Sequence, residues 1–382
     1  MLIGTEHEYS INDENFNPLA INDIIIKEIS GKVQNEFSIE KITISKELQK
    51  HVLEFKPTHP SESLISLEKE LHSGFLRFLA LLDHKYKFLG TGMHPLLKLD
   101  ETSYWEHGEE GDIYREYDRL FNIKQHGFLN IQALQVNIQY KNPEDMILLY
   151  NKIRSLLPFL IAITAASPFV DGKTTGFMDN RLIYYKENQK RIPIICNNVI
   201  SEKLRTKEDY MNILKKIYAE LEKENANILC REWIPSMGVI IRFSRNCLEI
   251  KALDEQECIH SDMAVTAFLL SLLKSKELSL DDEENILLEL SEKAIRYGTQ
   301  KLKPELEELY KIAWKNSNKE EMGYLPLIKR RIEEGSIAEM FVHQARKEDI
   351  SEILKAFEKS LENNKPYETP EVINEPCKVS KK

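Results

Sequence analysis

The chain has 382 residues, of which 42% are hydrophobic and 30% are charged, and its formal net charge is −10. These values are typical of a globular protein with one large or two ordinary domains, and the acidic balance argues against nucleic acid as the main partner. The most apolar run, residues 156–166, is too short to span a bilayer. Five scattered cysteines without a CxxC motif and an N-terminus without a signal-peptide pattern predict a cytoplasmic protein with reduced thiols.

The first predicted strand, GTEHEYSI at residues 4–11, carries two carboxylates on one face. Side chains alternate along a strand, so Glu6 and Glu8 share a face while His7 points to the opposite, core-type face. Two like charges at this spacing repel each other unless a cation lies between them. Taken alone, such a pair is more typical of a solvated sheet face. It indicates a metal site only in combination with other strands.

Three later strands repeat this polar pattern. The polar side chains are Glu54 and Lys56 in residues 51–56, Gln135, Asn137 and Gln139 in residues 134–139, and Glu249 and Lys251 in residues 247–251. If these strands are neighbours, one face of a sheet is rich in carboxylate and amide oxygens. Hard divalent ions such as Mg²⁺ prefer these ligands, and they usually accompany phosphates. The composition of this face therefore favours Mg²⁺–nucleotide chemistry over a zinc site.

Helix signals separate these strands. We expect a helix over residues 62–84 with Ser61 as its cap, and a second from the cap Asn142 towards residue 166 with a kink at Pro158. A third helix is expected over residues 207–225 behind a capping box, and a hairpin over residues 237–253.

Strand signals disappear beyond residue 261. Helices are expected at residues 262–274, 281–297, 303–316, 318–334 and 348–363, with Gly298 and Gly335 as stops. The predicted organisation is an α+β domain over residues 1–260, a helical portion over residues 261–365 packed on it, and a mobile tail over residues 366–382.

Other candidate motifs are weaker. His7 and His94 are more typical of structural histidines, and Cys258 with His260 lacks the second pair that a metal site needs. The chain has no P-loop and no G-x-G-x-x-G motif. The glycines of GTGMHP, residues 90–95, predict a turn but by themselves are a weak signal for phosphate binding.

Taken together and in order, six segments resemble glutamate–cysteine ligase family 2, the carboxylate–amine ligases. They are GTEHEYSI, LEFK, GTGMHP, LQVNIQY, residues 164–181 and CLEIKALDEQE. The most specific block is residues 167–181, in which Ser167, Pro168, Gly172, Lys173, Thr175, Gly176, Phe177 and Arg181 all fall in register with the family pattern. The Gln135-Val136-Asn137 strand resembles the plant-like branch. Lys251 departs from the family, which has arginine at this position.

The resemblance implies a glutamine-synthetase-like fold, in which a curved antiparallel sheet with flanking helices holds ATP and Mg²⁺, or Mn²⁺ in its place. It implies that ATP phosphorylates a carboxylate, most plausibly the γ-carboxylate of glutamate, and that an amine then displaces phosphate from the acyl phosphate. The implied metal ligands are Glu6, Glu8, Glu54, Gln135, Asn137 and Glu249. Arg181 and Lys251 would offset charge on the phosphoryl group, and Thr91, His94 and Lys173 would bind the nucleotide.

Two other functions remain open at this point. A guanidino-type phosphotransferase would use a similar sheet but release a stable phosphorylated product. A non-catalytic ATP-binding sensor would keep the cleft without turnover. In each case the expected partners are small molecules rather than nucleic acid or a membrane, and a homodimer is common for enzymes of this size. The sequence does not identify the amine.

Overall fold

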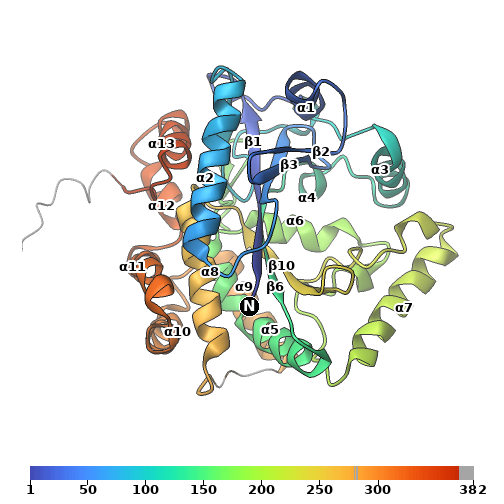
Figure 1. Ribbon diagram of the computed structural model, residues 1–382, viewed down its shortest axis with the longest axis vertical. Coiled ribbons are helices and arrows are strands. Elements are labelled where there is room, and N and C mark those ends of the chain that lie inside the picture. Colours follow the sequence, from blue (N-terminus) through green and yellow to red (C-terminus); the bar gives the residue numbers. More distant parts are fainter. Residues whose placement is uncertain (279, 281–282, 370–382) are drawn as a thin grey trace, which may run out of the picture.

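A computed structural model describes residues 1–278, 280 and 283–369 of the protein (Figure 1). An antiparallel sheet of eight strands crosses the molecule, in the order β2-β3-β4-β1-β6-β10-β9, with β5 pairing to β1 off this path. These strands are β1 (Ile3–Asn12), β2 (Glu36–Ile39), β3 (Ile42–Lys46), β4 (Val52–Pro57), β5 (Lys87–Leu89), β6 (Ala133–Gln139), β9 (Val239–Arg242) and β10 (Cys247–Asp254). A small separate hairpin joins β7 (Phe169–Val170) to β8 (Lys173–Thr174).

Helices surround the sheet. They are α1 (Asn22–Ser30), α2 (Leu64–Leu81), α3 (Gly108–Phe121), α4 (His126–Leu129), α5 (Pro143–Thr164), α6 (Asn180–Asn188), α7 (Lys207–Lys223), α8 (Ile259–Lys274), α9 (Glu284–Tyr297), α10 (Lys303–Asn316), α11 (Lys319–Glu334), α12 (Ile337–Gln344) and α13 (Ile350–Asn363). The predicted α+β class with one antiparallel sheet and a helical C-terminal portion is confirmed.

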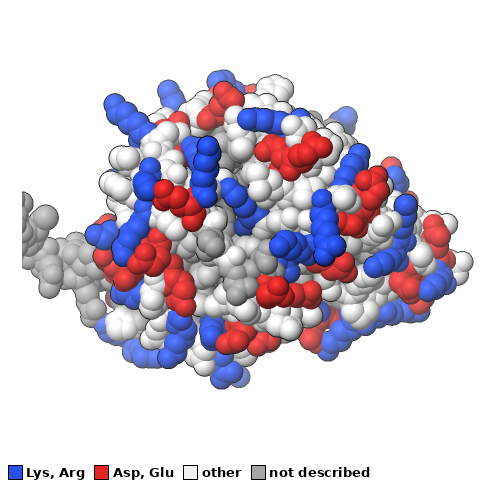
Figure 2. All heavy atoms as spheres, turned by 90° about the horizontal axis from the view of Figure 1, so that it is seen from below, with Lys and Arg blue, Asp and Glu red and all other residues white. Residues whose placement is uncertain are grey.

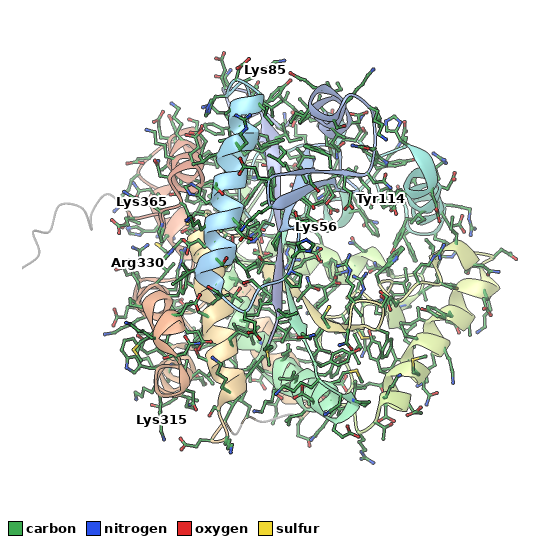
Figure 3. All side chains as sticks on the ribbon, in the orientation of Figure 1. Lys56, Lys85, Tyr114, Lys315, Arg330 and Lys365 are labelled. Carbon is green, nitrogen blue, oxygen red and sulfur yellow. The ribbon has the colours of Figure 1, made fainter. Side chains whose placement is uncertain are left out.

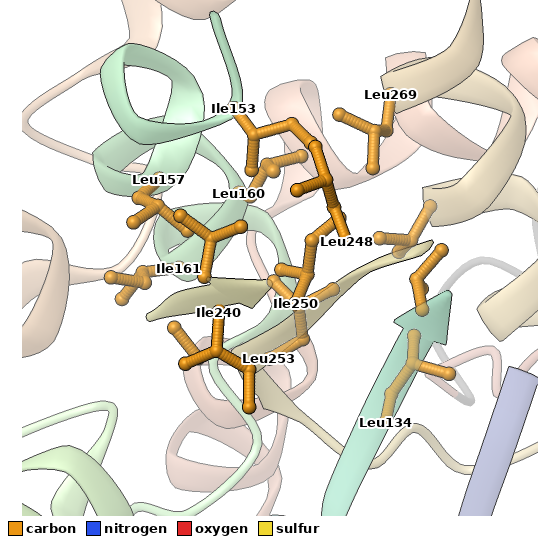
Figure 4. Packing of buried hydrophobic residues seen from close by; sticks show 14 of the residues in the cluster. Leu134, Ile153, Leu157, Leu160, Ile161, Ile240, Leu248, Ile250, Leu253 and Leu269 are labelled. Carbon is orange, nitrogen blue, oxygen red and sulfur yellow. The ribbon is translucent and has the colours of Figure 1, made fainter. Parts of the chain in front are cut away.

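The apolar face of the sheet packs against α2, α5 and α8. Figure 4 shows this core, where Ile250 of β10 lies between Leu157 and Leu160 of α5 on one side and Leu134 of β6 on the other. All four side chains are fully buried. Because strand side chains alternate, this packing turns the polar residues of β1, β4, β6 and β10 to the opposite face.

The central helix α5 is the one helix among the described residues that is long and apolar enough to cross a membrane by length and composition. Most of its apolar stretch is buried inside the fold, packed on β10, α8 and α9. This burial is that of the core helix of a globular protein.

Helix boundaries differ from the sequence expectations in small ways. The cap of α2 is Ser63, whose Oγ accepts a hydrogen bond from the N–H of Ser66, and not Ser61. Asn142 caps α5 as expected, and that helix continues through Pro158. The capping box of Thr206 with Asp209 is confirmed.

Four helices of eight residues or more were not predicted: α1, α3, α6 and α12. In α3 the signal is present, because Ile113, Tyr117, Leu120 and Phe121 follow a helical period and are buried. Two glycines and several acidic residues obscure that pattern in the sequence. The eight residues of α12 are too few to establish a period, although Ser336 and Glu339 form a capping box before it.

Helices α8 to α11 share the main core with the sheet, since α8 begins at Ile259 and packs on α2 and α5, whereas α12 and α13 pack in a second cluster with Leu89 and Phe169. A division of the chain near residue 260 stays a prediction. Tyr367 is buried against Phe357, with ring centroids 4.9 Å apart, and its N–H donates to Glu257 Oε1 at 3.0 Å. The first residues of the expected mobile tail are therefore packed, whereas residues 370–382, like residues 281–282 of the expected helix, lie outside the described residues.

Replacing Phe75 of α2 by alanine should lower the free energy of unfolding by about 3–5 kcal/mol. The ring is 1% exposed and contacts Tyr9, Phe55 and Phe88, so its loss leaves a cavity in the core. Denaturant unfolding checks this, with Ile65→Ala on the same helix as the control because Ile65 is 57% exposed. Equal effects of the two substitutions would contradict the packing described above.

Candidate active site

Three adjoining cavities form one cleft along the polar face of the sheet. A cavity of about 500 Å³ lies at the Gly4 end of β1, one of about 550 Å³ lies in the middle, and one of about 200 Å³ lies at the Glu8 end. The first two share Glu6 and Arg245, and the last two share Gln135 and Lys251. A fourth cavity of about 610 Å³ lies apart, between α9 and α12, and does not contain the residues discussed below.

Three carboxylates meet in the middle of the cleft. The register of β1 with β4 places Glu8 opposite Glu54, and Glu47 follows the end of β3. One oxygen from each of these three side chains lies within 4.8 Å of the others. Ser45 Oγ and Lys56 Nζ donate to Glu54 Oε1 at 2.7 and 2.9 Å. Figure 3 shows Lys56 beside the central strands, with Tyr114 on the α3 side.

Two further carboxylates extend the cluster. Glu6 Oε1 accepts from Asn137 Nδ2 at 3.0 Å and from Arg245 Nη1 at 2.9 Å. Glu249 pairs with Arg242, and Lys251 Nζ lies 3.5 Å from its other oxygen.

The two amides predicted as metal ligands bind carboxylates in this structure. Gln135 Nε2 donates to Glu8 Oε1 at 3.0 Å, in the same way as Asn137 donates to Glu6. All six predicted metal ligands therefore lie on one face, with the amides holding the carboxylates in place. Whether any of the six binds a metal stays a prediction.

Burial raises the pKa of several of these carboxyl groups. It raises the pKa of Glu6 to about 8, with Glu54 and Glu249 adding repulsion, and it raises the pKa of Glu8 well above its usual value. Burial and the charge of Glu54 raise the pKa of Glu47 to about 7. The pKa of Glu54 instead falls to about 2, because Lys56 and Ser45 outweigh the effect of burial.

This donor set fits Mg²⁺. The cluster offers carboxylate oxygens, which hard divalent ions prefer. Its ionised form is disfavoured by burial and mutual repulsion, and a divalent cation relieves both costs. The chemistry of the cleft thus matches a cation site more closely than a solvated sheet face.

At the far end of the cleft, Arg181 is fixed by Asp254. Arg181 Nε donates to Asp254 Oδ1 at 2.6 Å, and Asp254 also accepts from Ser167 Oγ at 2.7 Å. The pairing of β10 with β6 shifts register between Ile250 and Leu253, which places Leu253 in the core. The following residue, Asp254, is thereby turned towards Arg181. The 167–181 block is thus tied to β10 through one buried carboxylate.

The smallest cavity holds unpaired polar atoms. Among the described residues, Arg181 Nη2, Asn188 Oδ1 and Gln189 Oε1 are buried and have no hydrogen-bond partner. All three side chains line the 200 Å³ cavity. Buried polar groups are nearly always hydrogen-bonded, so one donor and two acceptors left free in one cavity indicate a bound polar ligand.

The structure does not bring the three predicted nucleotide contacts, Thr91, His94 and Lys173, to the cleft. Thr91 and His94 are fully buried, and Thr91 Oγ1 donates to the carbonyl of Met93. Lys173 is exposed on the small β7–β8 hairpin. The glycine turn serves packing, because a Cβ on Gly92 would lie 2.1 Å from the carboxyl carbon of Asp254. These three residues are therefore left outside the candidate site.

Sequence reasoning missed Glu47, Asn188, Gln189 and Arg245. Glu47 lies just outside the β3–β4 pairing, so no strand pattern marks it. Asn188 and Gln189 end a helix that was not predicted. Arg245 lies in the expected hairpin turn, where a charged residue is usually solvated.

His7 lies outside the cleft, on the opposite face of the sheet, and a structural role for it stays a prediction. Its Nδ1 lies 3.0 Å from Asp262 Oδ2 of α8, on the side of the sheet opposite the cleft. Glu255 lies beside this pair and accepts the backbone N–H of Glu8 at 2.9 Å. These buried contacts fix the backbone of β1 under the carboxylate cluster.

Comparison with known sequences identifies relatives along the whole chain. The pattern that defines glutamate–cysteine ligase family 2 matches residues 2–356. An uncharacterised protein of Archaeoglobus fulgidus is 48% identical over 96% of this chain and 100% of its own length. The chloroplastic glutamate–cysteine ligase of Brassica juncea and the glutamate–cysteine ligase of Halobacterium salinarum are each 25% identical, over 49% and 47% of this chain. These matches span 39% and 47% of the two ligases, so the chain covers less than half of either.

Solved structures with the same fold include two ligases. A glutamate–cysteine ligase of Francisella tularensis in complex with AMP aligns with a TM-score of 0.70, 14% identity, and coverage of 97% of this chain and 90% of its own. A bifunctional glutathione synthetase of Pasteurella multocida aligns with a TM-score of 0.66 and 14% identity over 95% of this chain and 52% of its own. At these identities the likeness establishes the fold.

The substitution Glu47→Gln should leave the melting temperature of the metal-free protein unchanged or slightly higher, since it removes a half-buried charge next to Glu54. It should also raise the Mg²⁺ concentration that is needed to stabilise the protein, by on the order of tenfold. Thermal melting across a Mg²⁺ titration measures both effects, with Glu109→Gln on exposed α3 surface as the control. A large drop in melting temperature with an unchanged Mg²⁺ response would assign Glu47 a purely structural role.

Proposed function

The chain belongs to glutamate–cysteine ligase family 2, and on this basis we propose that it is an ATP-dependent carboxylate–amine ligase that forms a γ-glutamyl amide. The observation that carries the proposal is the arrangement of the cleft. A buried carboxylate cluster lies between a cavity of about 500 Å³ and a small polar cavity of about 200 Å³. Two ligands of different size could therefore meet at the cluster.

Nucleotide use is supported by the neighbour of the same fold that was solved with AMP. In this chain Glu8, Glu47 and Glu54, with Glu6 and Glu249 beside them, would hold Mg²⁺. When bound, Mg²⁺ supplies positive charge that offsets the phosphates of ATP during phosphoryl transfer. ATP would occupy the larger cavities, next to the carboxylate cluster that would hold its Mg²⁺.

The proposed reaction has two steps. An oxygen of the substrate carboxylate attacks the γ-phosphorus of ATP, and the bond from this phosphorus to the bridging oxygen breaks. ADP is released, and the substrate now carries an acyl phosphate. The amine nitrogen then attacks the acyl carbon, inorganic phosphate leaves, and the nitrogen loses a proton. Both steps join groups that need orientation and charge neutralisation more than a protein nucleophile.

Lys251 is suited to neutralise charge in both steps. It lines the middle cavity and the small cavity, so it lies where the two substrates would meet. Although burial works against it, Glu249 raises the pKa of Lys251, and the side chain therefore stays protonated. An ammonium group at this point would stabilise the developing phosphoryl and acyl-phosphate charge.

The small cavity matches the zwitterionic end of an amino acid. The free Nη2 of Arg181 can donate to an α-carboxylate, while the free Oε1 of Gln189 can accept from an α-ammonium group. An amino acid held in this way would direct its side chain towards Glu8 and Glu47. This placement supports glutamate as the acid, with its γ-carboxylate at the cluster.

We expect the enzyme to act in the cytoplasm on small molecules, as a monomer or a homodimer. Basic and acidic side chains are interspersed on the face shown in Figure 2, without the single basic patch that nucleic acid would favour. The amine remains to be identified by assay.

The purified protein should release ADP from ATP and Mg²⁺ only when glutamate and one amine are both present. Individual amino acids and small amines are tested in turn, and the product is identified by mass. A phosphorylated product without an amide would favour the guanidino-type phosphotransferase. Tight ATP binding with no turnover for any pair would favour the sensor.

Gln189→Met should raise the KM for the amino acid by roughly tenfold to a hundredfold, because a charged ammonium group loses its acceptor. The KM for ATP should stay unchanged. Ser236→Ala is the matched control, since it removes the partner of Gln189 Nε2, 3.2 Å away, and leaves Oε1 in place. If both variants raise the two KM values equally, Gln189 acts only through the packing of the cavity.

A further inference from the structure

Arg245 crosses the cleft at the boundary between two cavities. It lies in the turn between β9 and β10, and its Nη1 reaches Glu6 Oε1 on β1 at 2.9 Å. Both residues line the 500 Å³ cavity and also the 550 Å³ cavity. The Arg245–Glu6 ion pair therefore stands between the space proposed for the nucleoside and the carboxylate cluster.

Of the two partners, Arg245 is held loosely and Glu6 is held firmly. The Arg245 side chain is 45% exposed, whereas that of Glu6 is 11% exposed and also accepts from Asn137. Among the described residues, Glu6 is the one carboxylate that pairs with Arg245. Because the Arg245 side chain is nearly half exposed, water can solvate its guanidinium group when it leaves, and a cation in the carboxylate cluster can take its place beside Glu6.

Two other cations of the cleft, Lys56 and Arg242, are held by several groups each. Lys56 contacts Glu54, Glu36 and Ser45. Arg242 contacts both Glu249 and Glu232. Within the described part of the chain Lys251 also has a single partner, Glu249, but its side chain is 21% exposed against 45% for Arg245, so Arg245 is the more exposed of the two cleft cations with one partner.

We propose that Arg245 exchanges partners during ligand binding, holding Glu6 while the cleft is empty and holding the phosphate chain of the nucleotide once a divalent cation occupies the carboxylate cluster. This inference rests on the proposed function. The cation neutralises the negative charge of Glu6 in place of Arg245, and the guanidinium group of Arg245 is then free to bind another anion. A guanidinium group is well matched to phosphate oxygens, because it donates two parallel hydrogen bonds.

The exchange predicts opposite effects of one substitution on two ligands. In the absence of nucleotide, Arg245 competes with the cation for Glu6, so Arg245→Gln should bind Mn²⁺ about twofold to fivefold more tightly. In the presence of Mg²⁺, the same variant should bind a non-hydrolysable ATP analogue roughly tenfold to a hundredfold more weakly, because a charged contact to phosphate is lost. A residue that merely supports the cleft would weaken both.

The experiment measures Mn²⁺ binding by electron paramagnetic resonance and binding of the analogue by calorimetry. Arg231→Gln is the matched control, because Arg231 is similarly exposed and pairs with Glu109 at 3.5 Å outside the cleft. Arg245→Lys should restore part of the nucleotide affinity, since it keeps the charge without the planar guanidinium group. Thermal melting of each variant confirms that it is folded.

Opposite shifts in the two affinities for Arg245→Gln, with no change in Arg231→Gln, would support the exchange. Unchanged affinities, or a parallel weakening of both, would overturn it while leaving the proposed function intact. Wild-type protein that binds neither Mn²⁺ nor the analogue would overturn the proposed function and the exchange with it.

Discussion

Repulsion among buried carboxylates is the constraint around which this protein is organised. Glu6, Glu8 and Glu54 are buried on one face of the sheet, and the half-buried Glu47 lies beside them, where like charges disfavour one another strongly. A cluster of this kind destabilises the folded state unless a bound ligand neutralises its charge. The strand register, the flanking amides and the ring of cations all serve to keep it assembled.

The surrounding cations neutralise different carboxylates of the cluster. Lys56 holds Glu54 ionised, and Arg242 with Lys251 balances Glu249, so that part of the negative charge is compensated permanently. The Glu8–Glu47 side of the cluster has no comparable ion pair among the described residues, and it is the side that faces the small polar cavity. The balance of charge therefore changes along the cleft. Carboxylates at the Arg245 end have cationic partners, whereas those at the end where the two substrates would react have none in the part of the chain that the structure describes.

The sequence predicted the parts of the site that lie in regular strands. Alternation alone assigned Glu6, Glu54, Asn137 and Glu249 to polar faces, and the ordered motifs related those faces to one another. Glu47 could not be found in this way, because it lies beyond the strand pairing and reaches the cluster only through the path of the chain. The glycine turn was misleading for a related reason. Gly90 and Gly92 have little contact with the cleft and instead allow close approach to Asp254 and Gln256, a tertiary contact that no local pattern reveals.

The contact between His7 and Asp262 has a consequence for how the protein is made. β1 is the central strand, yet two of its buried partners, Glu255 and Asp262, emerge from the ribosome about 250 residues later. Before then β1 can pair with β4 and pack Tyr9 against α2, but His7 lies in an apolar layer without its acid. Contacts so distant in sequence slow folding and leave intermediates exposed. The central strand of the sheet can therefore pair early in synthesis, whereas its buried anchor on α8 is completed only after the rest of the sheet has been made.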